Sequence, residues 1–353
     1  MRAVAVTAVL LFHANVSWLP GGFLGVDVFF VLSGFLITRL LLDEHTRRGA
    51  ISVGRFYARR ALRLFPALAV VTVAILVYAE LRLSPEQASR AWHDAFATAT
   101  YHMNWRLALG SAPPFGRFDH AWSLGIEEQF YLAWPVMVVV IVRRWGAQGV
   151  ALAAGAGALL SWAVRVALVA SDASPQRVYY GLDAHADGLL LGALLAAVTV
   201  LGAAGLRARR PPAPLGLLAL AALPVGFATL HLHSPRVDVF GLALVELGVL
   251  VIILDVISGG PTSWLLARRP LVLIGRVSYG AYLWHWPVYL AINGSEVSFG
   301  DTSLLALRLS VTAALTALSW VIVERPALRL KARFGSPRGV AVAAGRGLES
   351  PTM

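Results

Sequence analysis

Arg2 and His13 lie eleven residues apart at the two ends of an otherwise apolar segment, MRAVAVTAVLLFH. In an α-helix, eleven residues make just over three turns and rise roughly 16 Å, so both side chains would share one face at different depths. An ionisable group inside a membrane is costly, and its presence there favours a functional role. The spacing suits a long, charged substrate such as an acyl-CoA thioester, with Arg2 at the water interface and His13 near the centre of the bilayer.

The composition places this chain in a lipid bilayer. Hydrophobic residues make up 58% of it and charged residues 14%, and the mean hydropathy of +0.69 lies outside the range of soluble domains. The absence of cysteine excludes disulfides and thiolate nucleophiles, and we expect no metal site. The net charge of +11 comes from short arginine clusters between apolar runs, which membrane topology explains better than nucleic-acid binding.

Apolar runs of about twenty residues predict ten membrane-spanning helices. They lie near residues 3–19, 22–42, 62–80, 123–142, 149–170, 182–202, 214–231, 238–257, 271–291 and 304–323. With 81–122 as an external loop carrying an interfacial helix, the arginine clusters between spans fall on the same side as both termini, as the positive-inside rule requires. A signal peptide is the less favoured interpretation of the first run, because no small-residue cleavage pattern follows it.

These runs predict an all-α, polytopic protein of the bacterial inner membrane with both termini in the cytoplasm. The membrane domain covers residues 1–333, and 334–353 form a disordered cytoplasmic tail. Counting depth along the spans places nine polar residues in one layer of the outer half: His13, Asp27, Glu127, Glu128, Arg165, Asp183, His185, Asp187 and His285. Buried carboxylates need partners, so we expect a shared polar cavity, although snorkelling explains Arg165 equally well.

Two adjacent carboxylates, Glu127 and Glu128, stand in the segment DHAWSLGIEEQFYLAWP. Neighbours on a helix differ in direction by about 100°, so the two side chains must have different surroundings. We expect one to orient His13 or accept its proton, and the other to pair with an arginine. A purely structural role, clamping helices through Arg165 or His120, is the alternative.

The segment RFYARRALRLFPAL contains more arginine than topology requires. Guanidinium groups bind phosphate bidentately, so Arg2, Arg59, Arg60 and Arg63 are candidates for the phosphates of CoA. Topology or contact with anionic lipids would explain any one of them as well.

Five further residues are candidates for the cavity or the acceptor site: Asp27, Ser33, Trp122, Tyr279 and His285. Asp27 is harder to explain by helix packing than the small residues around it. Transfer of an acyl group requires an oxyanion donor, for which Ser33, Trp122 and Tyr279 are candidates. For His285, a role in helix packing is equally compatible with the sequence.

At these residues the chain resembles the bacterial membrane acyltransferase-3 family, whose members O-acylate cell-envelope glycans and some antibiotics. The resemblance runs from Arg2 to Pro326 and depends on the order and spacing of the Arg2 and His13 pair, GVDVFFVLSGFLIT, RFYARRALRLFPAL, HAWSLGIEEQFYLAWP, DAHADGLLLGALLA, IGRVSYGAYLWHWPV and ERP. It implies ten spans, a cytoplasmic acyl-CoA donor and an arginine–histidine pair needed for transfer, which here is Arg2 and His13. The family's paired glutamates correspond to Glu127 and Glu128.

The chain departs from the family pattern in three places. Relatives commonly have a short segment ending in an Asp-Gly-Leu-like run before the arginine, and a start codon further upstream would account for the difference. Many relatives carry a C-terminal hydrolase-like domain; without one, we expect a stand-alone enzyme whose acceptor enters the membrane domain. His185 stands where relatives often have arginine, so we assign it no role.

These features favour an O-acyltransferase that moves a short acyl group, with acetyl preferred, from acyl-CoA to a hydroxyl of a sugar-containing acceptor. The acceptor is an envelope or secreted glycan or a macrolide-type antibiotic, and acyl-CoA is a co-substrate, not a bound cofactor. His13 would be the general base, although an acyl-histidine relay is a variant. The alternative is a proton-coupled exporter of a glycan or lipid-linked precursor, which would also place carboxylates and histidines inside the membrane.

Overall fold

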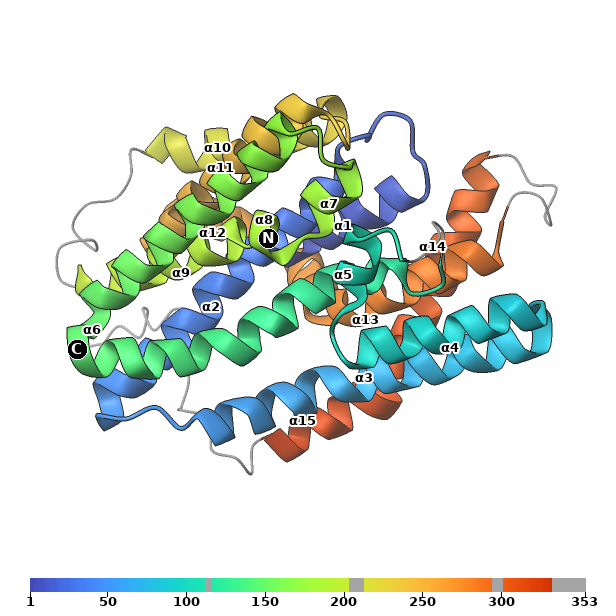
Figure 1. Ribbon diagram of the computed structural model, residues 1–353, viewed down its shortest axis with the longest axis horizontal. Helices are drawn as coiled ribbons and strands as arrows, with labels where there is room; N and C mark the ends of the chain where they lie inside the picture. The colour runs from blue at the N-terminus through green and yellow to red at the C-terminus, as the bar shows by residue number, and fades with distance from the viewer. Residues whose placement is uncertain (112–115, 203–212, 294–300, 332–353) are drawn as a thin grey trace, which may run out of the picture.

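The described chain consists of helices and the turns between them. The computed structural model describes residues 1–111, 116–202, 213–293 and 301–331 (Figure 1). No residue in these ranges lies in a β-strand, which confirms the predicted all-α class. The tail predicted over residues 334–353 lies outside the described residues.

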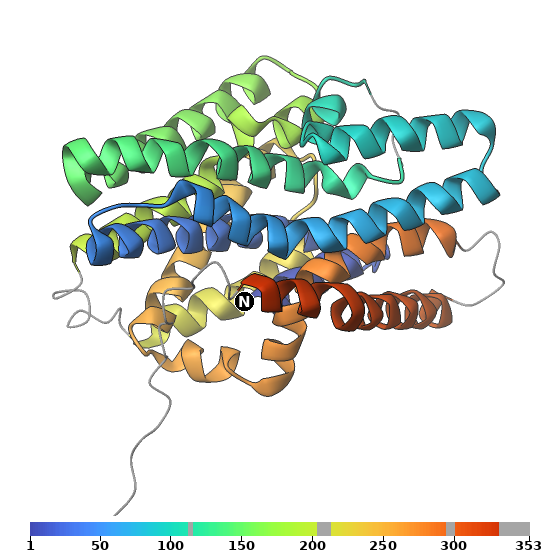
Figure 2. The same ribbon diagram turned by 90° about the horizontal axis from the view of Figure 1, so that it is seen from below.

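The helices are numbered along the chain as in Figure 1. They are α1 (Arg2–His13), α2 (Gly25–Arg48), α3 (Val53–Arg82), α4 (Pro85–Ala99), α5 (Met103–Ala108), α6 (Trp122–Ala170), α7 (Pro175–Tyr180), α8 (Leu182–His185), α9 (Asp187–Leu201), α10 (Ala213–Thr229), α11 (Leu242–Ile257), α12 (Pro261–Leu266), α13 (Arg269–Ala291), α14 (Asp301–Ser319) and α15 (Arg325–Lys331). In Figure 2, α2 and α3 (blue) lie between α6 (green) and α13 to α15 (orange and red).

Long apolar helices account for much of the predicted membrane-spanning structure. Among the described residues, five stretches are long and apolar enough to cross a membrane: Gly22–Arg48, Val53–Arg82, Asp119–Ala170, Val237–Ile257 and Asp301–Leu330. The third contains two predicted spans, because its helix kinks at Gly146, where φ is 61°. These helices support a membrane-embedded chain, while ten spans and cytoplasmic termini stay predictions.

The first helix is shorter than the sequence predicts. α1 has 12 residues and ends at His13, after which the chain turns at Asn15 with a φ of 58°. The predicted span over residues 3–19 is therefore wrong at its C-terminal end. His13 is the last helical residue and not one several residues inside a span.

The position of Arg2 also differs from the expectation. α1 packs antiparallel to α2 so closely that a Cβ on Gly25 would lie 2.4 Å from the carbonyl oxygen of Ala5. This packing places Arg2 beside Phe29, with 5.2 Å between its guanidinium carbon and the ring centre. From Phe29, α2 continues to Arg48 for roughly 28 Å. Arg2 therefore lies inside the helix bundle and not at its end.

Helices α2 and α9 touch through their backbones. A Cβ on Gly34 would lie 1.8 Å from the carbonyl oxygen of Leu189, and one on Gly192 would lie 2.1 Å from that of Val31. Small residues allow this approach between membrane helices. The contact fixes the wall of α2 that carries Ser33.

We expect Gly34→Ala to lower the free energy of unfolding by about 1–3 kcal/mol, because the added methyl group would push α2 away from α9. The matched control is Gly248→Ala in α11, where a Cβ would meet no atom within 4 Å. Alanine is the better helix former, so this variant should be at least as stable as the wild type. Thermal unfolding in detergent checks both; equal stabilities would contradict the close contact.

Candidate active site

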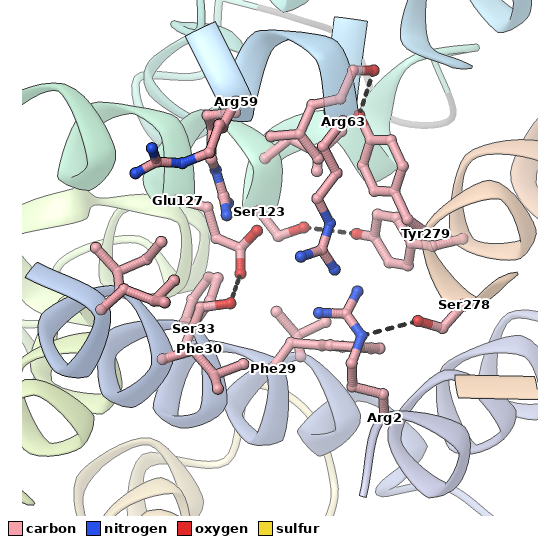
Figure 3. Close-up of a pocket in the computed structure, with 18 of the residues that line it drawn as sticks. Arg2, Phe29, Phe30, Ser33, Arg59, Arg63, Ser123, Glu127, Ser278 and Tyr279 are labelled. Atoms are coloured by element: carbon pink, nitrogen blue, oxygen red, sulfur yellow. Dashed lines mark hydrogen bonds between the residues drawn. The ribbon is translucent and has the colours of Figure 1, made fainter. Parts of the chain in front are cut away.

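Four arginines converge on one pocket of about 240 Å³ between α1, α2, α3, α6 and α13 (Figure 3). They are the four predicted to bind phosphate: Arg2, Arg59, Arg60 and Arg63. Figure 3 shows the guanidinium groups of Arg2 and Arg63 facing one another across the pocket, with Glu127 beside them. Residues distant in sequence thus form one strongly cationic site.

The four arginines differ in how far their charge is already neutralised. Arg59 lies 3.8 Å from a carboxylate oxygen of Glu44, and Arg60 lies 3.7 Å from one of Glu128. Arg2 donates a hydrogen bond of 3.1 Å to the hydroxyl of Ser278. Within the described part of the chain, neither Arg2 nor Arg63 has a carboxylate in ion-pair distance. These two guanidinium groups are therefore the ones available to an anionic ligand.

A second, larger cavity borders the same arginine pair. Its volume is about 670 Å³, and Arg2, Arg63 and Tyr279 line both cavities. Arg276 and Glu324 add polar groups to its otherwise largely apolar wall. A ligand held by Arg2 and Arg63 therefore has space on more than one side.

The paired glutamates point in different directions, as predicted. The Ser33 hydroxyl donates a hydrogen bond of 2.6 Å to Glu127 in the pocket, while Glu128 lies toward Arg60. The expectation that one glutamate contacts His13 is wrong, because the ring of His13 has a hydrogen bond with His285. Of the other cavity candidates, Ser33 and Tyr279 line the pocket.

A histidine pair joins α1 to α13. Nδ1 of His13 and Nε2 of His285 are 2.9 Å apart, and the two rings stack with centres 5.0 Å apart. Nδ1 of His285 lies 2.5 Å from the carbonyl oxygen of Tyr282, one turn earlier in α13. Trp286 packs its indole edge-to-face against His13, with ring centres 4.9 Å apart. His285 is fully buried, whereas His13 is half-buried.

A third histidine, His120, completes this cluster and was not predicted as a site residue. Its ring centre lies 5.7 Å from that of His285, and its backbone carbonyl accepts a hydrogen bond of 2.6 Å from the hydroxyl of Tyr282. It precedes the predicted span 123–142, so depth counting did not include it. The signal available in the sequence was its position two residues before Trp122, in the segment DHAWSLGIEEQFYLAWP that also contains the paired glutamates.

Tyr282 connects the pocket with the histidine cluster, because it lines the pocket and its ring centre lies 5.3 Å from that of His285. Ser123 and Tyr282 line the pocket, and their hydroxyl oxygens are 2.7 Å apart. His13 and His285 do not belong to the described pocket lining. One short helix, α1, thus carries Arg2 in the pocket and His13 in the histidine cluster.

A third group of polar residues is sealed inside the helix bundle. Asp27 lies 2.8 Å from Nε2 of His185, and Arg165 lies 2.5 Å from Asp187. All four side chains are at most 3% exposed. The predicted single cavity is therefore wrong: the layer divides among the arginine pocket, the histidine cluster and these buried pairs, and Asp183 forms an exposed pair with Arg177.

Three cavity candidates lie away from the pocket: His285 of the histidine cluster, Asp27 and Trp122. None of the three belongs to its described lining, which corrects our expectation for each. The indole of Trp122 packs against the rings of Tyr179 and His185, next to the buried ion pairs. Sequence depth could not separate these environments, because the residues lie at similar distances from their helix ends.

Comparison with known proteins places almost the whole chain in one family. A family profile described as "Acyltransferase domain" matches residues 1–324. The chain is 31% identical over 351 residues to the O-acetyltransferase OatA of Staphylococcus aureus, covering 92% of this chain and 56% of the relative. It is 34% identical over 341 residues to the peptidoglycan O-acetyltransferase OatA of Listeria monocytogenes, covering 92% of this chain and 54% of the relative.

The chain spans about half the length of these curated relatives. No solved structure matches it. The profile match extends over the helices that form the arginine pocket and the histidine cluster, so it covers the site as well as the fold. The chain therefore belongs to the membrane acyltransferase-3 family that its motifs resemble.

Proposed function

We propose that this protein is an O-acetyltransferase of the bacterial plasma membrane that transfers acetyl from acetyl-CoA to a hydroxyl of a cell-envelope glycan. The observation that carries the proposal is the arrangement at the two ends of α1. At one end Arg2 lies in the pocket with Arg63, and neither has a carboxylate of the described residues in ion-pair distance. At the other end His13 pairs with His285. The two O-acetyltransferases to which the chain is similar support acetyl as the group, and one of them is named for peptidoglycan.

The donor is bound by its phosphates. Arg2 and Arg63 supply fork-shaped donors of the kind that bind phosphate oxygens bidentately. From there the pantetheine arm extends along α1 toward His13, over the three helical turns between them. It must displace or pass the contact between Ser123 and Tyr282 to bring the thioester to the histidines.

His13 acts as the general base. Its ring takes the proton of the acceptor hydroxyl while the oxygen attacks the thioester carbonyl, and the C–S bond then breaks. The CoA thiolate leaves and takes the proton back from the imidazolium. Because His13 is only half-buried, a sugar hydroxyl can approach its ring.

We expect Arg63→Gln to raise the KM for acetyl-CoA by about 10- to 100-fold, since a charge-assisted hydrogen bond contributes about 1.5–3 kcal/mol. Initial rates in membranes with radiolabelled donor measure it. Acetyl-pantetheine, which has no phosphates, is the matched control donor, and its KM should be the same for both proteins. Arg59→Gln should have a smaller effect, because Glu44 already pairs with Arg59.

An equal rise in KM for both donors would contradict phosphate binding by Arg63. If the wild type transfers label from no acyl-CoA to any glycan, the assignment of acyl-CoA as the donor is wrong. Export of a glycan precursor without acyl-CoA would then favour a transporter.

A further inference from the structure

We propose that His285 is a positioning residue that holds His13 in the tautomer whose Nε2 is unprotonated and free to act as a base. The inference rests on the proposed function, because that function gives His13 its role. It begins at the Tyr282 carbonyl, which lies 2.5 Å from Nδ1 of His285. A carbonyl oxygen only accepts hydrogen bonds, so Nδ1 of His285 must carry the proton.

The protonation of His285 then determines which nitrogen of His13 carries the proton. A neutral imidazole with a proton on Nδ1 has a lone pair on Nε2. Nε2 of His285 lies 2.9 Å from Nδ1 of His13, so Nδ1 of His13 must be the donor. His13 therefore carries its proton on Nδ1, and its Nε2 is left unprotonated. This is the nitrogen that a general base needs.

The surroundings of His285 favour its neutral form. The side chain is fully buried, and the titratable groups packed around it are His13, His120, Tyr282 and Tyr289. No carboxylate of the described residues forms an ion pair with it. A charged imidazole in such a place would be costly. A charged His285 would also have to donate from Nε2, which would reverse the tautomer of His13.

The His13 ring is also held in orientation. Its plane lies at 25° to that of His285, to which it is joined through Nδ1, and Trp286 meets it edge-to-face on another side. Nδ1 points at His285, so Nε2, across the ring, points away from it. When Nε2 takes a proton from the acceptor, Nδ1 can keep its hydrogen bond to the lone pair of His285. The arrangement resembles the orienting role that a carboxylate has in a catalytic triad, but the orienting group is neutral.

The direct test is the protonation state of His13. In the full chain in lipid nanodiscs, labelled with ¹⁵N-histidine, both His13 and His285 should have a protonated Nδ1 and an unprotonated Nε2. The His13 resonances are assigned by their loss in His13→Gln, and those of His285 by their loss in His285→Leu. In His285→Leu, the His13 resonances should move toward the opposite tautomer. A wild-type His13 with an unprotonated Nδ1 would overturn the proposal.

The kinetic test separates positioning from packing. His285→Leu removes the acceptor, and we expect kcat for acetyl transfer to fall about 100-fold with an unchanged KM for acetyl-CoA. His285→Gln keeps an amide oxygen near the Nε2 position, so it should recover at least about 10-fold of that loss. Equal losses in both variants would overturn the proposal, as would an equal loss in His102→Gln, which alters a histidine outside the cluster.

The two readouts keep this inference apart from the proposed function. If the wild type transfers no acetyl, the proposed function fails, and the spectrum still decides the tautomer of His13. If transfer occurs but the spectrum shows the opposite tautomer, the inference fails and the function stands.

Discussion

Replacing His13 with glutamine is expected to lower kcat for acetyl transfer by about 10²–10⁴-fold, the usual contribution of a general base. Glutamine has a similar size and can still form a hydrogen bond with His285, but its amide cannot accept a proton. The KM for acetyl-CoA should change little, because His13 does not belong to the described lining of the arginine pocket. Steady-state rates over a range of donor concentrations measure both constants.

The control for this variant is His93→Gln, which changes an exposed histidine of α4 and should leave transfer unchanged. Retention of wild-type kcat by His13→Gln would contradict the assignment of His13 as base. The same protein also distinguishes the relay mechanism. An acetyl-histidine intermediate would accumulate in the wild type without acceptor and be absent from the variant, whereas direct transfer leaves neither protein labelled.

Loss of Arg165 should have the largest effect on stability. Its guanidinium group binds Asp187 at 2.7 and 2.5 Å and the Ala184 carbonyl oxygen at 2.8 Å, and no part of it is exposed. Arg165→Leu would leave the Asp187 carboxylate buried without its counter-charge, next to the buried Glu246. We expect the free energy of unfolding to fall by about 3–5 kcal/mol. Unfolding in detergent and the yield of folded protein measure this loss.

Two further variants make the interpretation specific. Replacing Asp187 by leucine together with Arg165 removes both charges, and this double variant should be more stable than Arg165→Leu alone. Arg177 forms a similar two-pronged pair with Asp183, at 2.9 and 2.5 Å, but those side chains are 23% and 42% exposed. Arg177→Leu should cost about 1 kcal/mol or less. Equal losses for the buried and exposed pairs would show that burial does not set the effect.

The sequence was most informative where one segment carries its own signal. Apolar runs predicted the helices because hydropathy is summed over many neighbouring residues. Arg59, Arg60 and Arg63 of α3 were predicted to act with Arg2, because their segment contains more arginine than topology requires. The structure places all four in one pocket. Glu127 and Glu128 were predicted to face different partners, since adjacent residues on a helix cannot point the same way.

Partners from distant helices were not predictable in the same way. His13 and His285 are 272 positions apart, and no pattern in either segment specifies that their rings stack. Depth counting also assumed straight spans that begin at the membrane surface. Because α1 ends at His13 and Arg2 lies beside Phe29, far from the C-terminal end of α2, those depths were wrong. The close contact of α2 with α9 depends on Gly34 and Gly192, whose nearest atoms are backbone carbonyl oxygens. Every residue has such an oxygen, so the sequence does not indicate which one each glycine meets.

The contact between Ser123 and Tyr282 bears on how the cell keeps its membrane potential. The proposed transfer from a cytoplasmic donor to an envelope acceptor requires a path through the membrane domain, and an open path would also conduct protons and ions. Each elementary charge that crosses dissipates about 2.3 kcal/mol per 100 mV of membrane potential. On the proposed mechanism this path meets the hydrogen bond between Ser123 and Tyr282, whose oxygens are 2.7 Å apart, and it has to open there only while the pantetheine arm passes. Transfer that opens this contact for the donor alone would cost the cell little of its membrane potential.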